Sequence, residues 1–464
     1  MIKNKGIHFE ISERKILLRV FDVFFVLGAL YFVGIIFDFS YFEINSVNFY
    51  WTIVLSLYLL TIGSVFEMYH LQVASSEYQV IRSIVLTSVI TVLAYLLTPL
   101  FTPPLPSNRI QILFFFLSIL IALLLWRIFY AKYLASHRFE KKVILICDDH
   151  ELEELRNDLS GIDPHYKILG FVNVSVRNTK LKKSISDQVI SVNEMETFAK
   201  SNKVSEIVIA AQNTEGLTAE LYNKLLFLLE SGFVIREYTH VYESMTQRIP
   251  VHYVSRDFYK YFPFSRSNQN QLYLWTVRLL ELIVSFIGIL AGFLILPFIL
   301  IGNFFGNRGK LFYTQERVGR NGKVFRIVKF RTMVKNAEDQ GAVFASVNDT
   351  RVTKFGKFLR KTRLDEVPQF INILLGEMAV IGPRPERPVF VNQIAEQMPF
   401  YQTRHVIKPG LTGWAQVNYP YGDSFEDSLM KLQYDLYYIK HRSIFLDLNI
   451  IIKTLSTVLF FRGQ

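Results

Sequence analysis

Long, uninterrupted hydrophobic runs dominate the first 130 residues of the chain. Each run has about the 20 residues that a helix needs to cross a bilayer, because a helix rises only about 1.5 Å per residue. The buried helical core of a soluble protein would show shorter runs with more polar interruptions. The pattern therefore predicts four membrane-spanning helices, over roughly 16–37, 47–66, 80–101 and 111–130.

The positions of lysine and arginine around these runs predict their orientation, since loops rich in these residues stay in the cytoplasm. Basic residues gather before the first run and after the last one, whereas the loop that follows the first run has none. Both ends of the bundle are therefore expected in the cytoplasm. The first run is too long for a signal-peptide core and lacks a small-residue cleavage site, so we interpret it as an anchor.

From about residue 140 to 240 short apolar runs such as KVILIC and EIVIAA alternate with helical patterns such as TAELYNKLLFLLES. Alternation of this kind predicts βαβ units and a parallel sheet. The run KVILIC is followed by DDHELEE and not by a G-x-G-x-x-G turn, and two aspartates there would repel a pyrophosphate. We therefore interpret this part as a structural or regulatory α/β domain.

A further apolar segment, 272–302, is long enough to span the membrane, but basic residues flank it on both sides. A simple span would carry one basic flank outward, against the usual charge distribution. Pro297 removes a helix hydrogen bond and clashes with the preceding turn. The pattern favours a re-entrant helix, broken at Pro297, over a kinked spanning helix. The flanking residues are Lys260, Arg266, Arg308 and Lys310.

The composition shows that this largely apolar chain is also strongly basic. The chain of 464 residues is 51% hydrophobic and yet carries a formal net charge of +11. Nucleic acid would explain the charge but none of the apolar segments, so anionic lipid and anionic substrates are the expected partners. The single cysteine, Cys147, excludes an internal disulfide and a cysteine-based zinc site, and the nine histidines lack ligand spacing.

Three basic clusters follow the last apolar segment. The stretch 313–333 predicts a β-hairpin with a turn at Asn321-Gly322, and it places Lys329 and Arg331 on one strand face. Between 308 and 335 there are nine lysines and arginines and one acid. The segment 351–363 adds six basic residues in the pattern of a helix at a membrane surface.

The third cluster lies in IGPRPERP, where Pro383 and Pro385 restrain the backbone around Arg384. Arg387 follows in the same segment. Arginine is suited to bidentate contact with phosphate. The three clusters together therefore predict an anion site.

The acidic pair Asp365-Glu366 lies among these cations, in RLDEVPQF. A carboxylate among cations is expected to have a lowered pKa and to be ionised at neutral pH. Such a group attacks phosphorus or holds a divalent metal, provided that cations or Mg²⁺ neutralise the phosphate. We expect one carboxylate to attack and the other to hold Mg²⁺. An ordinary surface pair in salt bridges is the alternative.

These residues resemble the bacterial sugar transferases, also called monotopic phosphoglycosyl transferases. The resemblance covers roughly 270–464 and rests on KFRTM, RLDEVPQFINILLGEMAVIGPRPERP, KPGLTGWAQVN and KLQYDLYYIK. With the preceding spans and α/β domain, the chain looks like the long form, the polyprenyl-phosphate hexose-1-phosphate transferases. The resemblance implies a membrane α plus α/β fold. Its parts are a four-helix transmembrane bundle (1–138), a Rossmann-like α/β domain (139–268) and a monotopic α/β catalytic domain with a re-entrant helix (269–464).

The resemblance also implies a reaction at the cytoplasmic face of the bacterial inner membrane. A UDP-hexose gives its sugar-1-phosphate to undecaprenyl phosphate, UMP leaves, and exopolysaccharide or capsule synthesis begins. The family's nucleophile matches Asp365, and its Mg²⁺ ligand matches Glu366, with Asp365 as a second candidate ligand. The family's helix break matches Pro297. Its phosphate-binding residues match Lys329, Arg360 and Arg384, and we add Arg331 and Arg387 as candidates.

Two departures from the family stand out: the CDDH stretch lacks a glycine-containing turn, and Arg442 replaces a usual tryptophan. Two other functions remain open. One is a non-catalytic membrane scaffold that binds nucleotide sugar and recruits assembly partners. The other is a nucleotide-sugar oxidoreductase, which the missing glycine turn disfavours. No motif marks the sugar, and four spans without an obvious ligand pocket would support a homodimer.

Overall fold

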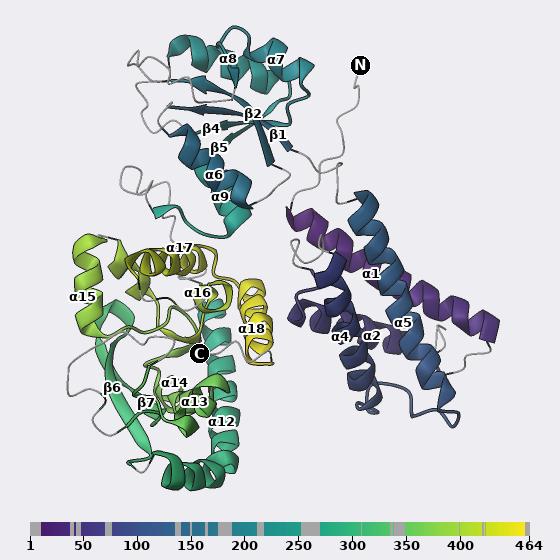
Figure 1. The fold of residues 1–464 in the computed structure, drawn as a ribbon, viewed down its shortest axis with the longest axis vertical. Coiled ribbons are helices and arrows are strands. Elements are labelled where there is room, and N and C mark those ends of the chain that lie inside the picture. The colour runs from purple at the N-terminus through teal and green to yellow at the C-terminus, as the bar shows by residue number, and fades with distance from the viewer. Residues whose placement is uncertain are drawn as a thin grey trace. The chain divides into compact units, whose positions relative to one another are not determined.

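In the computed structural model the chain divides into two compact units, Met1–Val241 and Tyr242–Gln464. Figure 1 labels their helices and strands. The predicted flanking residues Lys260, Arg266 and Arg308 lie outside the described residues, as do Asp149 and His150 of the stretch after the first strand. The structure describes residues 11–37, 41–42, 48–69, 77–134, 141–148, 151–162, 166–174, 188–210, 218–251, 270–307, 309–334, 337, 349–398, 400–419, 422 and 424–459.

All four apolar runs of the first unit form helices. Two of them, α1 and α5, are long and apolar enough to cross a membrane, whereas α2 and α4 are shorter apolar helices. Pro99 explains the early end of α4, because proline and the residue before it resist helical geometry. The passage of α2 and α4 through the membrane stays a prediction. The four helices are α1 (Ile11–Phe37), α2 (Phe49–Val65), α4 (Glu77–Leu96) and α5 (Ile110–Phe129).

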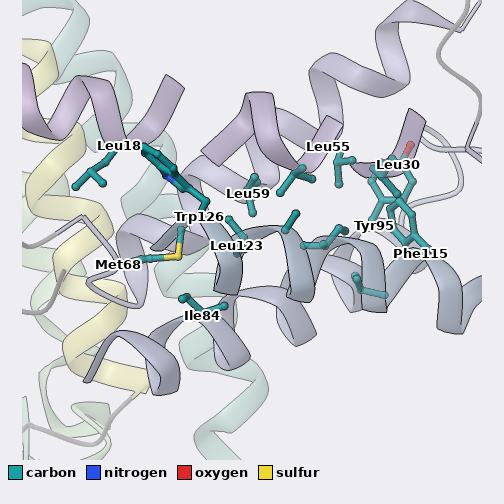
Figure 2. Packing of buried hydrophobic residues seen from close by; sticks show 14 of the residues in the cluster. Leu18, Leu30, Leu55, Leu59, Met68, Ile84, Tyr95, Phe115, Leu123 and Trp126 are labelled. Atoms are coloured by element: carbon teal, nitrogen blue, oxygen red, sulfur yellow. The ribbon is translucent and has the colours of Figure 1, made fainter. Parts of the chain in front are cut away.

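Side chains from all four helices pack into one hydrophobic cluster (Figure 2). Each helix contributes the residues of one face and leaves other large hydrophobic residues exposed. An exposed apolar face on a packed helix suits a lipid environment better than water. The labelled members of the cluster are Leu18, Leu30, Leu55, Leu59, Met68, Ile84, Tyr95, Phe115, Leu123 and Trp126.

A charged pair lies inside this cluster of helices. Arg127 of α5 donates from Nε and Nη2 to the two carboxylate oxygens of Asp22 in α1, over 3.0 and 2.6 Å, and both side chains are completely buried. Ionised side chains within apolar helices are costly unless they are paired, and a bidentate contact satisfies both charges. The pair therefore fastens α1 to α5.

The second part of the first unit is a five-stranded parallel sheet with the order β3-β2-β1-β4-β5. Helices cover both faces of the sheet, as Figure 1 shows, so the central strand β1 is buried on both sides. The predicted parallel α/β sheet is confirmed. The elements are β1 (Lys141–Cys147), α6 (Leu152–Ile162), β2 (Tyr166–Asn173), β3 (Gln188–Val189), α7 (Met195–Ser201), β4 (Glu206–Ile209), α8 (Ala219–Glu230), β5 (Val234–Glu237) and α9 (Tyr238–Thr246).

The second unit begins within α9, at Tyr242, and contains α12, an antiparallel hairpin, β6–β7, and a small parallel pair, β8–β9. Its helices surround these strands. The elements are α12 (Gln271–Gly302), β6 (Phe312–Val318), β7 (Val324–Phe330), α13 (Lys354–Lys361), α14 (Gln369–Leu375), β8 (Ala379–Ile381), α15 (Pro388–Gln397), β9 (Gly410–Thr412), α16 (Trp414–Asn418), α17 (Phe425–His441) and α18 (Ile444–Leu459), with short turns η4 (Asn303–Asn307), η5 (Arg320–Gly322), η6 (Leu364–Glu366) and η7 (Tyr401–Val406).

The predicted hairpin is confirmed, but its connection is longer than two residues. Strand pairing ends at Val318 and Val324, so the residues 319–323 form the loop. Asn321 and Gly322 lie in this loop with φ angles of 57° and 76°. These left-handed conformations are the ones that asparagine and glycine tolerate best, so the dipeptide was a correct turn signal.

Both ends of helix α12 pack against other elements of the second unit. Near its start, Arg278 donates to the carbonyl oxygens of Ile373 and Leu374 in α14, over 2.8 and 2.9 Å. Near its end, Ile299 packs with Phe330 of β7 and Leu359 of α13. The rest of its surface exposes large apolar side chains. One side of α12 therefore packs on the rest of its unit, while the other side exposes apolar side chains.

Pro297 lies inside α12, and the helix continues to Gly302. The ribbon of α12 changes direction in its C-terminal part (Figure 1). A proline removes one helix hydrogen bond and displaces the preceding turn, which is the usual cause of a sharp bend. The expected break at Pro297 is thus a bend and not an interruption of the helix.

Arg442 lies in the connection between α17 and α18 and packs on two tyrosine rings. Its guanidinium lies over the rings of Tyr273 and Tyr438, at 5.2 and 6.0 Å from their centroids. Both tyrosine hydroxyls donate to Asp447 of α18, over 2.5 and 2.7 Å. A guanidinium on an aromatic face is attractive, so Arg442 occupies a packed position and α18 stays fastened to the start of α12.

Helix α13 carries basic residues of the second cluster, and Gly356 allows it to approach β7 closely. A Cβ atom at Gly356 would lie 2.0 Å from the backbone oxygen of Thr332, just past the end of β7. Backbone oxygen cannot move aside as a flexible side chain does. We expect Gly356→Ala to destabilise the protein by about 2 kcal/mol, and thermal unfolding in detergent measures the loss.

Gly28→Ala is the matched control for this substitution. Gly28 lies in helix α1, and nothing lies within 4 Å of a Cβ atom added there. This variant should unfold at the wild-type temperature or slightly above it, because alanine favours a helix over glycine by about 1 kcal/mol. Equal unfolding temperatures for Gly356→Ala and wild type would show that α13 does not depend on this close approach.

Candidate active site

The acidic pair lies in the tight turn η6, between α13 and α14. Asp365 and Glu366 are both only 7% exposed. Arg363, which precedes the turn, has a φ angle of 59°, a left-handed conformation that is uncommon for a residue other than glycine. Leu364 and Val367 on either side of the pair pack into the cluster that joins α12, α13 and β7. Apolar packing on both flanks therefore fixes the position of the two carboxylates.

Three cations surround the carboxylate of Glu366. Its Oε1 accepts hydrogen bonds from Lys329 Nζ and Arg384 Nη2, both over 3.0 Å, and its Oε2 accepts from Arg363 Nη1 over 3.4 Å. Burial acts to raise the pKa of Glu366, but the neighbouring charges of Lys329, Arg384 and Arg363 outweigh it and hold the pKa well below the usual value. Glu366 is therefore ionised over the whole physiological pH range.

Asp365 has a different environment. Among the described residues its carboxylate has no hydrogen-bond or ion-pair partner. Burial, followed by the charge of Glu366, raises the pKa of Asp365 to about 6, against the opposing effects of Lys329, Arg360 and Arg384. The expectation of a lowered pKa is thus right for Glu366 and wrong for Asp365, because burial outweighs the cations there. At neutral pH Asp365 is still mostly ionised.

The structure brings three of the five predicted phosphate-binding residues to the acidic pair. Lys329 reaches it from β7 and Arg384 from the segment after β8. Arg360 of α13 donates from Nε to Thr332 Oγ1 over 3.0 Å, and its charge acts on Asp365. A phosphate beside Asp365 would therefore meet cations from three separate elements.

The other two predicted residues, Arg331 and Arg387, make their described contacts with residues outside the acidic pair. Arg331 donates from Nε to the backbone oxygen of Lys310 over 3.0 Å, and its guanidinium lies over the ring of Tyr313. Arg387 precedes α15 and lies over the ring of Phe390, 5.8 Å from its centroid. Neither residue is among the described hydrogen-bond partners of Glu366, which are Lys329, Arg363 and Arg384.

Sequence reasoning missed two residues that organise the site. Arg363 was counted with the basic cluster, but nothing in the sequence indicated the left-handed backbone that brings it to Glu366. Asn372 of α14 donates to the backbone oxygen of Arg326 over 2.9 Å and accepts from the backbone nitrogen of Val328 over 3.1 Å. It thereby ties the helix after the acidic pair to the strand of Lys329. A buried asparagine in the apolar run FINILL was the available signal.

The described residues contain no group of three or more His, Cys, Asp or Glu side chains that could hold a metal ion. Mg²⁺ commonly takes one or two carboxylates and completes its shell with water and substrate phosphates. The adjacent carboxylates of Asp365 and Glu366 fit that mode of binding.

Comparison with known proteins finds relatives of the part of the chain that contains the acidic pair. Residues 272–461 match the family model described as bacterial sugar transferase. The UDP-N-acetylgalactosamine-undecaprenyl-phosphate N-acetylgalactosaminephosphotransferase of Aeromonas hydrophila is 48% identical over 151 residues, which are 32% of this chain and 36% of that protein. The UDP-glucose:undecaprenyl-phosphate glucose-1-phosphate transferase of Klebsiella pneumoniae is 45% identical over 150 residues, 32% of each chain.

A shorter relative is covered almost completely. The putative undecaprenyl-phosphate N-acetylgalactosaminyl 1-phosphate transferase of Bacillus subtilis is 40% identical over 153 residues, which are 32% of this chain and 86% of that protein. The matched part of this chain thus spans about a third of the length of the two longer relatives and most of the shorter one.

Fold and site together define a membrane α plus α/β protein with a buried, cation-surrounded carboxylate pair. The chain belongs to the bacterial sugar transferase family. The family match lies within the second unit, which contains the acidic pair and all the predicted phosphate-binding residues.

Proposed function

We propose that the protein transfers a hexose-1-phosphate from a UDP-hexose to undecaprenyl phosphate and releases UMP. The observation that carries the proposal is the division of roles between two adjacent carboxylates. Glu366 is held by three cations, whereas Asp365 has no described partner and lies buried beside the same charges. The names of the A. hydrophila and K. pneumoniae relatives support the two substrate classes.

The chemistry has two steps on one phosphorus atom. A carboxylate oxygen of Asp365 attacks the phosphorus that bears the sugar, a new P–O bond forms, and UMP leaves with the electron pair of the broken P–O bond. A phosphate oxygen of undecaprenyl phosphate then attacks the same phosphorus, and the P–O bond of the aspartyl phosphate anhydride breaks to restore the Asp365 carboxylate. A carboxylate without a hydrogen-bond partner is the better nucleophile of the two, because no donor holds its lone pairs.

The surrounding cations make this attack feasible. An anion approaches a phosphate only when the phosphate charge is neutralised, and Lys329, Arg360 and Arg384 are the groups placed to do so. Mg²⁺ held by Asp365 or Glu366 and by the phosphates would supply further neutralisation. Glu366 keeps Lys329 and Arg384 at fixed positions before substrate arrives.

The position of α12 supports a re-entrant helix and a site at the membrane surface. Both ends of α12 pack on the same unit, which a helix crossing the bilayer between two aqueous compartments would not do. In the middle of α12, Gly288 lies against Phe370 and Gly292 against Val367, directly after the acidic pair. The pair would then lie near the headgroups of the cytoplasmic leaflet of the bacterial inner membrane, where a lipid-linked phosphate is available.

An assay with the purified full-length protein tests the proposed reaction. UDP-glucose, UDP-galactose and UDP-N-acetylgalactosamine, each radiolabelled in the sugar, are offered together with undecaprenyl phosphate and Mg²⁺. We expect label in the lipid extract and UMP in the aqueous phase for one or more of them. Binding of a UDP-sugar without any labelled lipid would instead favour the non-catalytic scaffold. A productive reaction would place the protein at the first membrane step of exopolysaccharide or capsule synthesis.

Labelling of single cysteines tests the re-entrant arrangement. Cys147 is buried and is replaced first; then Leu272→Cys and Lys310→Cys, both at exposed positions, are made separately. Both are expected to react with a membrane-impermeant maleimide added from the cytoplasmic side. Reaction of only one of them from that side would mean that α12 spans the membrane.

A further inference from the structure

The backbone around Arg384 is held at four successive carbonyl oxygens. The oxygen of Pro383 accepts from the backbone nitrogen of Gly410 in β9, and that of Glu386 accepts from the backbone nitrogen of Val318 in β6, both over 2.9 Å. Two small strand segments thus fix the ends of the stretch.

Arginine side chains hold the two carbonyl oxygens between them. The oxygen of Arg384 accepts from Arg404 Nη2 over 3.0 Å, and that of Pro385 accepts from Arg317 Nη1 over 2.9 Å. Pro383 and Pro385 have no backbone N–H, so this stretch is held mainly by hydrogen bonds to its carbonyl oxygens. The two arginines therefore bond to the part of the chain from which the Arg384 side chain extends.

Arg404 is itself fixed from two sides. It is 4% exposed, and its Nη2 also donates to Asp435 of α17 over 2.7 Å, while its Nη1 donates to the hydroxyl of Tyr401 over 2.6 Å. Asp435 is 1% exposed. A buried arginine with an ionised partner and two further acceptors is rigid, because each bond restricts the planar guanidinium further.

We propose that Arg404, supported by Asp435, and Arg317 are positioning residues that aim the Arg384 guanidinium at Glu366 and at the phosphate beside Asp365. The inference rests on the proposed function. It also gives a reason for the aspartate in the KLQYDLYYIK motif of α17, which lies far along the chain from the acidic pair. Neither arginine touches either carboxylate of the pair. Their effect on transfer would pass through Arg384.

A double-mutant cycle in the full-length protein tests this route. Arg404→Lys keeps the charge beside Asp435 but loses the planar fork, and we expect kcat/KM for the UDP-sugar to fall by about 10²-fold, the usual effect of a misplaced binding group. In the Arg384→Ala background the same substitution should reduce kcat/KM by less than about threefold, because the group that it positions is absent. Thermal unfolding is measured for every variant.

Arg317→Lys forms a second cycle and keeps the test decisive if Arg404→Lys does not fold. Arg326→Gln is the matched control, since Arg326 is exposed on β7 and pairs only loosely with Glu316 at 3.8 Å. It should leave transfer unchanged. The contrary result is that Arg404→Lys and Arg317→Lys lower kcat/KM in the Arg384→Ala background by the same factor as in the wild type and also lower the unfolding temperature. That result would overturn the positioning role and would mean that the two arginines only stabilise the fold. No transfer by the wild-type protein with any UDP-sugar would instead overturn the proposed function.

Discussion

Asp365→Asn is expected to reduce sugar-phosphate transfer by at least about 10³-fold and to leave folding and membrane insertion intact. The amide has the shape of the carboxylate but cannot form the acyl phosphate, and loss of a nucleophile is among the largest single effects in enzymes. The fold should tolerate the change, because Asp365 has no hydrogen-bond or ion-pair partner among the described residues. Label in the lipid extract measures transfer, and extraction with carbonate measures insertion.

Stability gives an independent check on this variant. The pKa of Asp365 is about 6 in the folded protein, above the ordinary value of 3.8, so ionisation of this group opposes folding. The wild type loses this part of its stability as pH rises from about 4 to 6, and the asparagine variant does not. The variant should therefore unfold at a higher temperature than the wild type at pH 7 and at a similar temperature at pH 4. Glu396→Gln, at an exposed position of α15, is the control for loss of an acid.

Full transfer activity of Asp365→Asn would reject the covalent role of this residue. A phosphosugar adduct trapped on the wild type and absent from the variant would support it. Such an adduct is expected when the wild type is mixed with UDP-sugar and no lipid acceptor, because the second step then has no substrate.

Glu366→Gln is expected to reduce transfer by about 10²-fold and to shift the pH dependence of the residual activity. The amide leaves Lys329, Arg384 and Arg363 without the anion that holds them, so the cations are no longer fixed for the phosphate. Wild-type transfer should fall as pH drops through about 6, where Asp365 becomes protonated. Because the charge of Glu366 raises the pKa of Asp365, its removal should move this fall to lower pH.

The stability of Glu366→Gln should change in the opposite sense from that of Asp365→Asn. The folded-state pKa of Glu366 is depressed, so its ionised form stabilises the fold above its ordinary pKa of 4.5, and this contribution is lost as pH falls below that value. The glutamine variant should therefore be less stable than the wild type at pH 7, and the difference should shrink in acid. The pH at which transfer activity falls is the second measurement on this variant. If Glu366→Gln loses transfer activity at the same pH as the wild type, the charge of Glu366 does not affect the ionisation of Asp365.

Much of the fold could be predicted because it depends on local periodicity. Apolar runs gave the N-terminal helices, alternating segments gave the parallel sheet, and Asn321-Gly322 marked the hairpin. The errors were in lengths: α4 ends at Leu96 and the hairpin loop has five residues, 319–323. The end of a strand depends on where its pairing stops, and the end of a helix such as α4 depends on where a proline follows it. The pattern of hydrophobic residues does not contain that information.

The site could be predicted only as far as charge and motif could locate it. Lys329, Arg360 and Arg384 stood out because they were basic residues in clusters, and the structure brings all three to the acidic pair. The pKa of Asp365 could not be predicted, because counting cations ignores burial. The contact between Arg404 and Asp435 was equally inaccessible, since it joins two elements whose packing is set by the tertiary fold.

The ion pair between Asp22 and Arg127 has a consequence for how the N-terminal part of the chain is made. The two residues are 105 positions apart, so the ribosome has added α2 and α4 before the arginine emerges. A solitary carboxylate is costly in hydrocarbon, and α1 cannot settle there by itself at low cost. If α1 and α5 cross the membrane, Asp22 gains its charged partner only when α5 is inserted, so α1 is expected to reach its full stability in lipid only after α5 has been added.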